Sequence, residues 1–347
     1  ALHCGDQSLS YRAYADRIIE LARRLGGLDT SVRVATLLPN GIAACVAHFG
    51  VLAAGAQLLP MNPAYTAREL AFQLNDAECQ VVIADPQWRK TIEPLARNSG
   101  ADVIWFDGTL SPDDQTLGPG AETRSARGET DRACERLPDR VDPQALAILQ
   151  YTGGTSGRPK GVDLTHAALY TNVVQREAVL PTRQGAETIL CAMPLFHSYA
   201  MAMGLYMGAR CAATLVILPA FHREPFFDAI EAHRVTLLPG SPSIYVALMA
   251  HPRFATTDWS SLRMGYSGSA ALPVAVLRRW EETVKAPIFE GYGMTEAGPV
   301  LSFNGPLRPA KAGSVGQPLP QTEIEIVDLQ TGRQRLPAHH CGEIRVR

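Results

Sequence analysis

A short apolar strand followed by a glycine-rich loop constrains the fold of this chain more than any other stretch. Residues 145–149 are apolar, and residues 151–161 continue as Tyr-Thr-Gly-Gly-Thr-Ser-Gly-Arg-Pro-Lys-Gly. Glycine accepts backbone conformations with positive φ, so such a loop can approach a ligand closely. Its successive N–H groups and its Thr and Ser hydroxyls form a site for anions, to which Lys160 adds a positive charge. The strand and loop together predict a phosphate-binding turn.

This loop does not match two widespread phosphate-binding patterns. Lys160 follows Pro159 and no Gly-Lys-Ser/Thr triplet occurs, so the loop is not a Walker A sequence. The dinucleotide fingerprint is also absent, because it needs glycines at three fixed spacings. Taken alone, a glycine-rich stretch is often an ordinary solvated turn, so the choice between such a turn and a phosphate-binding loop depends on the other motifs of the chain.

Composition predicts a globular protein with a large core. A length of 347 residues suits one large domain or two to three subdomains, and 46% hydrophobic with 19% charged residues predicts a sizeable core. The net charge of −2 gives no reason to expect a nucleic-acid partner. Seven cysteines without CxxC spacing indicate reduced thiols of a cytoplasmic protein rather than a disulfide framework or a zinc site. The apolar runs at 41–61 and 201–221 contain polar residues and are predicted to be buried core elements.

Strand and helix patterns alternate along most of the chain. Ser10 is a predicted helix N-cap, and Thr66 with Glu69 predicts a capping box. Alternation of this kind predicts an α/β fold, with parallel βαβ units and helices on both faces of the sheets. The predicted parts are a first βα subdomain at 1–107, a flexible connector at 108–143, a second βα subdomain at 144–312 and the start of a small β subdomain at 313–347.

Two further motifs carry chemistry. Residues 290–296 read Glu-Gly-Tyr-Gly-Met-Thr-Glu and follow a predicted strand. In a short loop, an aromatic ring can stack on a purine, a hydroxyl can bind phosphate, and a carboxylate can hold Mg²⁺ against phosphates. Residues 193–200 place His197 among apolar neighbours, where a lone histidine more often has a structural than a catalytic role.

Together these motifs resemble those of the adenylate-forming superfamily, which contains acyl-CoA synthetases, peptide-synthetase adenylation domains and luciferases. The loop at 152–161 matches the phosphate loop of that superfamily, and 290–296 resembles its Tyr-Gly-x-Thr-Glu motif. The stretches at 193–200, 266–272 and 313–318 are also similar, so the resemblance covers nearly the whole chain. It implies the fold of the large N-terminal domain. The segments at 62–70 and 149–151 favour the bacterial medium- and long-chain fatty acyl-CoA synthetases.

The resemblance also implies roles for individual residues. Tyr292 would contact adenine, Thr295 the α-phosphate and Glu296 a Mg²⁺ ion, while His197 would orient or gate the acid. The candidates for catalysis are Lys160, His197, Thr295 and Glu296. The expected nucleotide-binding residues are Thr152, Gly153, Gly154, Thr155, Ser156, Gly157, Lys160, Ser269, Ala270, Glu290, Gly291, Tyr292, Gly293 and Thr295. The expected acid-binding residues are His197, Met201, Ser241, Tyr245, Gly268 and Met294.

The implied reaction uses ATP, Mg²⁺ and CoA. A carboxylate, expected to be a medium- or long-chain fatty acid, would form acyl-AMP with release of pyrophosphate and then pass to CoA. An aryl-acid CoA ligase would carry the same motifs, and a carrier-protein thiol remains an alternative acceptor. Amino-acid adenylation domains resemble one another in placing an Asp directly after a Phe at the start of the pocket helix. In this chain His197 follows Phe196, so amino-acid adenylation is disfavoured. Peripheral membrane contact through the fatty acid and a homodimer are further expectations that stay open.

One departure from the superfamily pattern concerns the end of the chain. The resemblance leads us to expect, beyond residue 347, an Asp for the ribose, a hinge and a small C-terminal domain with a Lys that assists adenylation. These features are absent from this sequence. We therefore expect the 347-residue chain to bind ATP and acyl-AMP but to form little thioester. A nucleotide- or acyl-AMP-binding fragment without turnover is the corresponding alternative.

Overall fold

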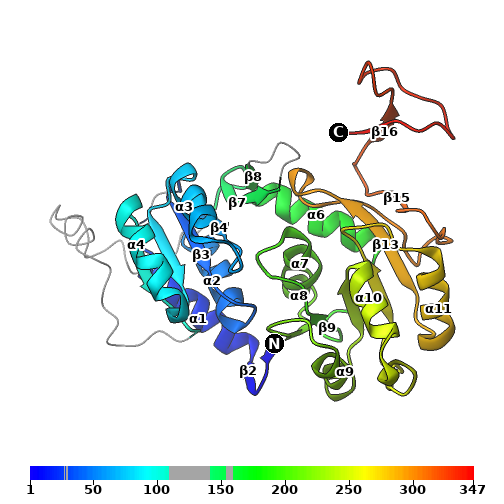
Figure 1. Ribbon diagram of the computed structural model, residues 1–347, viewed down its shortest axis with the longest axis horizontal. Coiled ribbons are helices and arrows are strands. Elements are labelled where there is room, and N and C mark those ends of the chain that lie inside the picture. Colours follow the sequence, from blue (N-terminus) through cyan, green and yellow to red (C-terminus); the bar gives the residue numbers. More distant parts are fainter. Residues whose placement is uncertain (27, 29, 109–140, 154–158) are drawn as a thin grey trace.

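The computed structural model describes residues 1–26, 28, 30–108, 141–153 and 159–347, in which two mostly parallel sheets are covered by helices (Figure 1). The strands of the first sheet, in spatial order, are β6 (Asp102–Trp105), β5 (Val81–Ala84), β3 (Arg33–Leu37), β4 (Gln57–Pro60), β7 (Leu146–Thr152) and β8 (Lys160–Thr165). Those of the second sheet are β15 (Gln317–Pro318), β14 (Val300–Phe303), β13 (Ile288–Gly293), β12 (Met264–Ser267), β11 (Leu237–Gly240), β9 (Thr188–Cys191), β10 (Thr214–Ile217), β1 (Leu2–Cys4) and β2 (Gln7–Leu9). A separate antiparallel hairpin, β16 (Ile324–Val327) and β17 (Glu343–Val346), stands away from both sheets near the C-terminus (Figure 1).

Helices connect most of the strands, as the alternating pattern predicted. The α-helices are α1 (Tyr11–Arg24), α2 (Ile42–Ala53), α3 (Ala67–Asp76), α4 (Arg89–Ser99), α6 (His166–Val179), α7 (Ser198–Ala200), α8 (Met207–Arg210), α9 (Arg223–Ala232), α10 (Pro242–Met249) and α11 (Val274–Val284). A π-helical stretch, η3 (Met201–Tyr206), joins α7 to α8, and short 3₁₀ turns are η1 (Pro86–Trp88), η4 (Pro252–Ala255) and η5 (Thr295–Ala297).

The predicted helix starts are confirmed. The Ser10 side chain accepts a hydrogen bond from the backbone N–H of Ala13, which satisfies one of the free donors in the first turn of α1. Thr66 and Glu69 form a complete capping box at the start of α3. These contacts involve neighbours in sequence, so the local pattern is sufficient to predict them.

The two sheets divide the chain differently from the predicted subdomain boundaries. β7 lies at 146–152, inside the predicted second subdomain, yet it pairs in parallel with β4 of the first sheet. β1 lies in the predicted first subdomain, yet it pairs in parallel with β10 of the second. Strand pairing depends on long-range contacts that the hydrophobic pattern does not encode. The predicted connector at 108–143 lies largely outside the described residues.

A continuous apolar core extends through both halves of the molecule. It contains Leu58 of the first sheet and Ile189 of the second, and both side chains are almost completely buried. Helix α2 and the helical segment 198–210 lie between the sheets (Figure 1). The apolar runs at 41–61 and 201–221 therefore form core elements, as predicted. Among the described residues, no helix combines the length and apolar character needed to span a bilayer.

A buried polar contact joins α2 to the helical segment. The Nε2 atom of His48 lies 2.5 Å from the hydroxyl of Tyr206, and only 4% of His48 is exposed. Burial lowers the pKa of His48 to about 3, because the charged imidazolium loses its hydration. The folded protein therefore holds His48 in its neutral form at any pH near neutrality.

Acidification is expected to destabilise the fold through His48. Below about pH 6.5 the unfolded chain binds a proton at this position and the folded chain does not, so stability falls with decreasing pH until about pH 3. One such group lowers the free energy of unfolding by about 2 kcal/mol between pH 7 and pH 5. Urea unfolding at both pH values should show a smaller loss for His48→Gln than for the wild type. The exposed His222→Gln is the matched control, and an equal loss in all three proteins would contradict the assignment.

Candidate functional site

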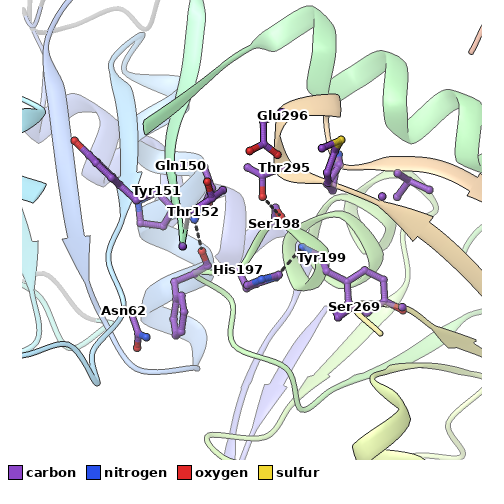
Figure 2. Close-up of a pocket in the computed structure, with 18 of the residues that line it drawn as sticks. Asn62, Gln150, Tyr151, Thr152, His197, Ser198, Tyr199, Ser269, Thr295 and Glu296 are labelled. Carbon is purple, nitrogen blue, oxygen red and sulfur yellow. Dashed lines mark hydrogen bonds between the residues drawn. The ribbon is translucent and has the colours of Figure 1, made fainter. Parts of the chain in front are cut away.

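A cavity of about 610 Å³ lies where strands of the two sheets end (Figure 2). Its walls include Pro60 and Thr152, the last residues of β4 and β7 in the first sheet. From the second sheet it takes Gly268, which follows β12, and Gly293, which ends β13. The carboxyl ends of parallel strands are the usual place for a ligand in α/β sheets, because the connecting loops there converge from several strands.

The phosphate-loop motif contributes the ends of the hairpin β7–β8 to this cavity. Thr152 and Lys160 are directly opposite each other in the antiparallel register, and both line the cavity with Gly153. The Lys160 ammonium group forms no ion pair with any described residue, so the described wall leaves its charge available to an anion. Four expected nucleotide-binding residues lie outside the described residues and stay predictions: Gly154, Thr155, Ser156 and Gly157.

The second motif forms the turn after β13. A register shift between Tyr292 and Gly293 ends the regular pairing of β13 with β14, and η5 begins at Thr295. A Cβ atom at Gly293 would lie 1.9 Å from the carbonyl oxygen of Pro299, so only glycine fits this backbone approach. Tyr292 and Thr295 are half-buried on the cavity wall, whereas Glu296 is exposed there.

The third motif places His197 on the same cavity as the N-cap of α7. Its Nδ1 atom accepts a hydrogen bond of 3.3 Å from the backbone N–H of Tyr199. The imidazole is exposed on the cavity, but the surrounding protein removes part of its hydration and lowers the pKa of His197. The segment before it is held by Asn40, whose amide donates to Met193 O at 2.8 Å and accepts from Leu195 N–H at 2.7 Å. His197 is therefore a neutral, positioned group.

Tyr199 lines the cavity beside Gly268. Its hydroxyl donates to the carbonyl oxygen of Tyr266 at 3.2 Å, and its ring lies against Gly268, where a Cβ atom would be only 3.1 Å from two ring carbons. Met201 and Tyr245, which were expected to bind the acid, are 1% and 0% exposed and do not border the cavity. Both side chains instead belong to the hydrophobic core.

Three more expected residues also lie away from the cavity wall. Ser241 precedes α10, and its hydroxyl lies 2.8 Å from that of Ser243. Glu290 is 5% exposed, and its carboxylate accepts a hydrogen bond of 2.7 Å from the backbone N–H of Leu272. This bond secures the loop after β12. Ala270 is exposed but does not line the cavity.

The remaining expected residues are brought together by the fold. They are Thr152, Gly153, Lys160, His197, Gly268, Ser269, Gly291, Tyr292, Gly293, Met294, Thr295 and Glu296. The cavity also includes residues that were not expected at the site: Pro60, Asn62, Tyr65, Gln73, Gln150, Tyr151, Phe196, Ser198, Tyr199, Pro299, Val300 and Phe303. Several of these residues lie in the stretches at 62–70, 149–151 and 193–200, which resemble the superfamily. Their proximity to those motifs is the sequence signal that could have identified them as cavity residues.

The site suits a metal ion that arrives with phosphate groups. In the described part of the chain, no group of three or more His, Cys, Asp or Glu side chains is arranged to hold a metal. Glu296 is the one carboxylate among the described cavity residues, and it has no hydrogen-bond partner among them. Mg²⁺ commonly binds through one or two carboxylates plus substrate phosphates, so this single exposed carboxylate fits a nucleotide-bound ion.

Comparison with known proteins agrees with this architecture. The family model described as "AMP-binding enzyme" matches residues 1–347, and the chain belongs to that family. It is 35% identical over 342 residues to a long-chain-fatty-acid–CoA ligase of Bacillus subtilis (strain 168), with 92% of this chain and 61% of the relative covered. It is 32% identical to a 4-coumarate–CoA ligase of Vanilla planifolia, with coverages of 96% and 62%.

The fold is likewise similar to a solved structure. ATP-bound MatB from Rhodopseudomonas palustris superposes with a TM-score of 0.85 at 28% identity, over 100% of this chain and 66% of MatB. The resemblance to the fold of adenylate-forming enzymes is thereby confirmed. The chain spans about six-tenths of the length of the curated relatives it matches.

Proposed function

We propose that this chain supplies the nucleotide- and acid-binding site of an AMP-forming acid–CoA ligase. The observation that carries the proposal is the single cavity that Lys160, Glu296 and His197 share, although they come from three separate motifs. A cation, a free carboxylate and a neutral histidine around one space match the needs of a reaction between a nucleoside triphosphate and an acid. The names of the curated relatives support the same activity.

The proposed first step joins the acid to AMP. A carboxylate oxygen attacks the α-phosphorus of ATP, the bond to the β-phosphate oxygen breaks, and pyrophosphate leaves with the electron pair. Lys160 stabilises the charge on the leaving group, while the Thr295 hydroxyl donates to an α-phosphate oxygen. Glu296 would hold Mg²⁺, which neutralises phosphate charge when it is bound. In the second step, a thiolate attacks the acyl carbon and AMP leaves.

Acid activation needs positioning rather than proton abstraction. A carboxylic acid with an ordinary pKa is already ionised at pH 7, so the first step requires no general base. A neutral His197 beside the acid avoids a strong ion pair that would bind the ground state as well as the transition state. The residue therefore has an orienting role in this proposal, and the rate enhancement comes from holding the two substrates in line.

For the acid, we propose an apolar compound and specifically a medium- or long-chain fatty acid. The B. subtilis relative is named for such a substrate. An aryl acid is the second candidate, because Phe196 and Tyr199 give the acid end of the cavity aromatic walls and the V. planifolia relative is named for 4-coumarate. Contact with a membrane surface remains a prediction from the fatty-acid assignment, and homodimer formation is a separate prediction.

The test is pyrophosphate release by the whole natural protein over a panel of acids. The panel contains octanoate, palmitate, 4-coumarate, benzoate and a neutral amino acid, each with Mg·ATP. Fatty acids giving the highest kcat/KM would support the first assignment, and 4-coumarate or benzoate the second. Thioester formation is then compared for CoA and a phosphopantetheinylated carrier protein. Release of no pyrophosphate with any acid would overturn the proposal.

Dicarboxylic acids are expected to be poor substrates. Lys160 and Glu296 are the charged side chains on the described cavity wall, and both belong to the phosphate-facing motifs. The described wall therefore offers no cation to a second carboxylate at the acid end, and an unpaired buried carboxylate is very costly. We expect kcat/KM for succinate to be at least about a hundredfold below that for octanoate. Succinate or malonate as the best substrate would contradict the predicted apolar site.

A further inference from the structure

The hydroxyl groups of Ser198 and Thr295 face each other at the cavity, although they come from distant parts of the chain. Ser198 is the first residue of α7, and Thr295 is the first residue of η5. Their Oγ atoms are 3.1 Å apart, and Figure 2 shows this contact as a dashed line. Ser198 is 6% exposed. Among the described residues, neither hydroxyl has another hydrogen-bond partner.

The number of protons limits how this pair can be arranged. Each hydroxyl carries one proton and can accept as well as donate. Only one proton can lie between the two oxygens, so the other must point elsewhere. When Ser198 is the donor, the Thr295 proton is directed out of the pair. When Thr295 is the donor, its proton is held by Ser198 and cannot reach a ligand.

An anion beside Thr295 decides between the two arrangements. A hydroxyl that donates to a negatively charged oxygen makes a shorter and stronger hydrogen bond than one that donates to a neutral oxygen. An α-phosphate oxygen at the Thr295 side of the cavity therefore favours the arrangement in which Ser198 donates inward. Ser198 then satisfies Thr295 Oγ1 as an acceptor and restricts its side-chain rotation, so less conformational freedom is lost when the phosphate binds.

We propose that Ser198 is a positioning residue that directs the Thr295 hydroxyl proton toward the α-phosphate. The inference rests on the proposed function, which places a nucleotide in this cavity. It also links the two halves of the site. Ser198 directly follows His197, and Thr295 directly precedes Glu296, so one hydrogen bond joins the acid-facing segment to the phosphate-facing turn.

The experiment is a double-mutant cycle in the whole natural protein. Ser198→Ala, Thr295→Val and the combined variant are compared with the wild type in pyrophosphate release at saturating acid. Ser198→Ala is expected to lower kcat/KM for ATP by about threefold to tenfold, the value of one hydrogen bond. In the Thr295→Val background the same change should have less than about a twofold effect, because the residue it positions is gone. Ser198→Thr, which keeps the hydroxyl, should restore most of the activity.

A binding measurement makes the test independent of turnover. A non-hydrolysable acyl-sulfamoyl adenosine carries its sulfonyl oxygens where the α-phosphate would lie. Calorimetry should show that Ser198→Ala binds this analogue about threefold to tenfold more weakly than the wild type. In the Thr295→Val background, Ser198→Ala should not weaken binding further. Unchanged affinity and activity in Ser198→Ala would overturn the inference while leaving the proposed function intact. Equal losses in both backgrounds would overturn it too, because they indicate a general structural role. A wild-type protein that neither binds the analogue nor releases pyrophosphate would instead overturn the proposed function, and the inference with it.

Discussion

Replacing Lys160 with alanine is expected to lower the rate of pyrophosphate release by about thirtyfold to a thousandfold. Lys160 begins β8 directly opposite Thr152, and its ammonium group faces the cavity without an ion-pair partner among the described residues. In the proposed reaction negative charge moves onto pyrophosphate as the bond to the α-phosphorus breaks. A fixed cation at that position stabilises the transition state more than the ground state, so its loss should reduce kcat as well as kcat/KM.

Glu296→Ala is expected to have an effect of similar size for a different reason. In the proposed reaction its carboxylate holds the nucleotide's Mg²⁺ ion, so the variant should also need a higher Mg²⁺ concentration for half-maximal activity. Lys160→Ala should leave that Mg²⁺ concentration nearly unchanged. This difference separates the two roles within one assay.

Matched surface variants control for general effects of charge removal. Lys90→Ala on α4 removes an exposed positive charge, as Lys160→Ala does, and Glu282→Ala on α11 removes an exposed negative charge, as Glu296→Ala does. Neither Lys90 nor Glu282 lines the cavity. Both should retain wild-type rates. Near-wild-type pyrophosphate release by Lys160→Ala and Glu296→Ala, in protein with unchanged thermal unfolding, would show that the phosphate site lies elsewhere.

If the proposed function is right, Tyr199→Ala is expected to shift the preference of the whole natural protein toward longer acids. The Tyr199 ring lies against Gly268 on the cavity wall, and under the proposed function it limits the space for a long acyl chain. Removing the ring makes room for additional methylene groups, and each buried methylene is worth about a fourfold change in kcat/KM. The ratio of kcat/KM for palmitate to that for octanoate should therefore rise by at least about tenfold.

Two control variants distinguish the effect of the Tyr199 ring from the effects of its hydroxyl and of a nearby core side chain. Tyr199→Phe keeps the ring and loses the hydroxyl that donates to Tyr266 O, so the acid profile should remain that of the wild type. Met201→Ala removes a core side chain that does not border the cavity and should lower stability without changing the palmitate-to-octanoate ratio. An unchanged ratio in Tyr199→Ala, or a large change in Met201→Ala, would contradict a role for Tyr199 in limiting acid length.

Much of this protein was predictable from the sequence because the relevant interactions are local. The capping box of Thr66 and Glu69 depends on residues three apart, and its complete formation is a property of that short stretch. The motifs around Lys160, His197 and Tyr292 also keep their spacing in the chain, and each follows a strand whose apolar pattern is plain. The family therefore follows from the sequence alone, and so do the residues that these motifs supply to the cavity.

Other features were decided only by tertiary contacts. Hydrophobicity indicates that Met201 and Tyr245 are buried, but it does not distinguish a side chain in the core from one on a cavity wall. For the same reason the sequence did not identify Tyr199 as a cavity residue, because its ring packs against Gly268, which lies far along the chain. The contact between Ser198 and Thr295 spans 97 positions and exists because separate strands of one sheet end at the same edge. Local patterns identified the chemical groups, whereas long-range strand pairing determined which of them meet.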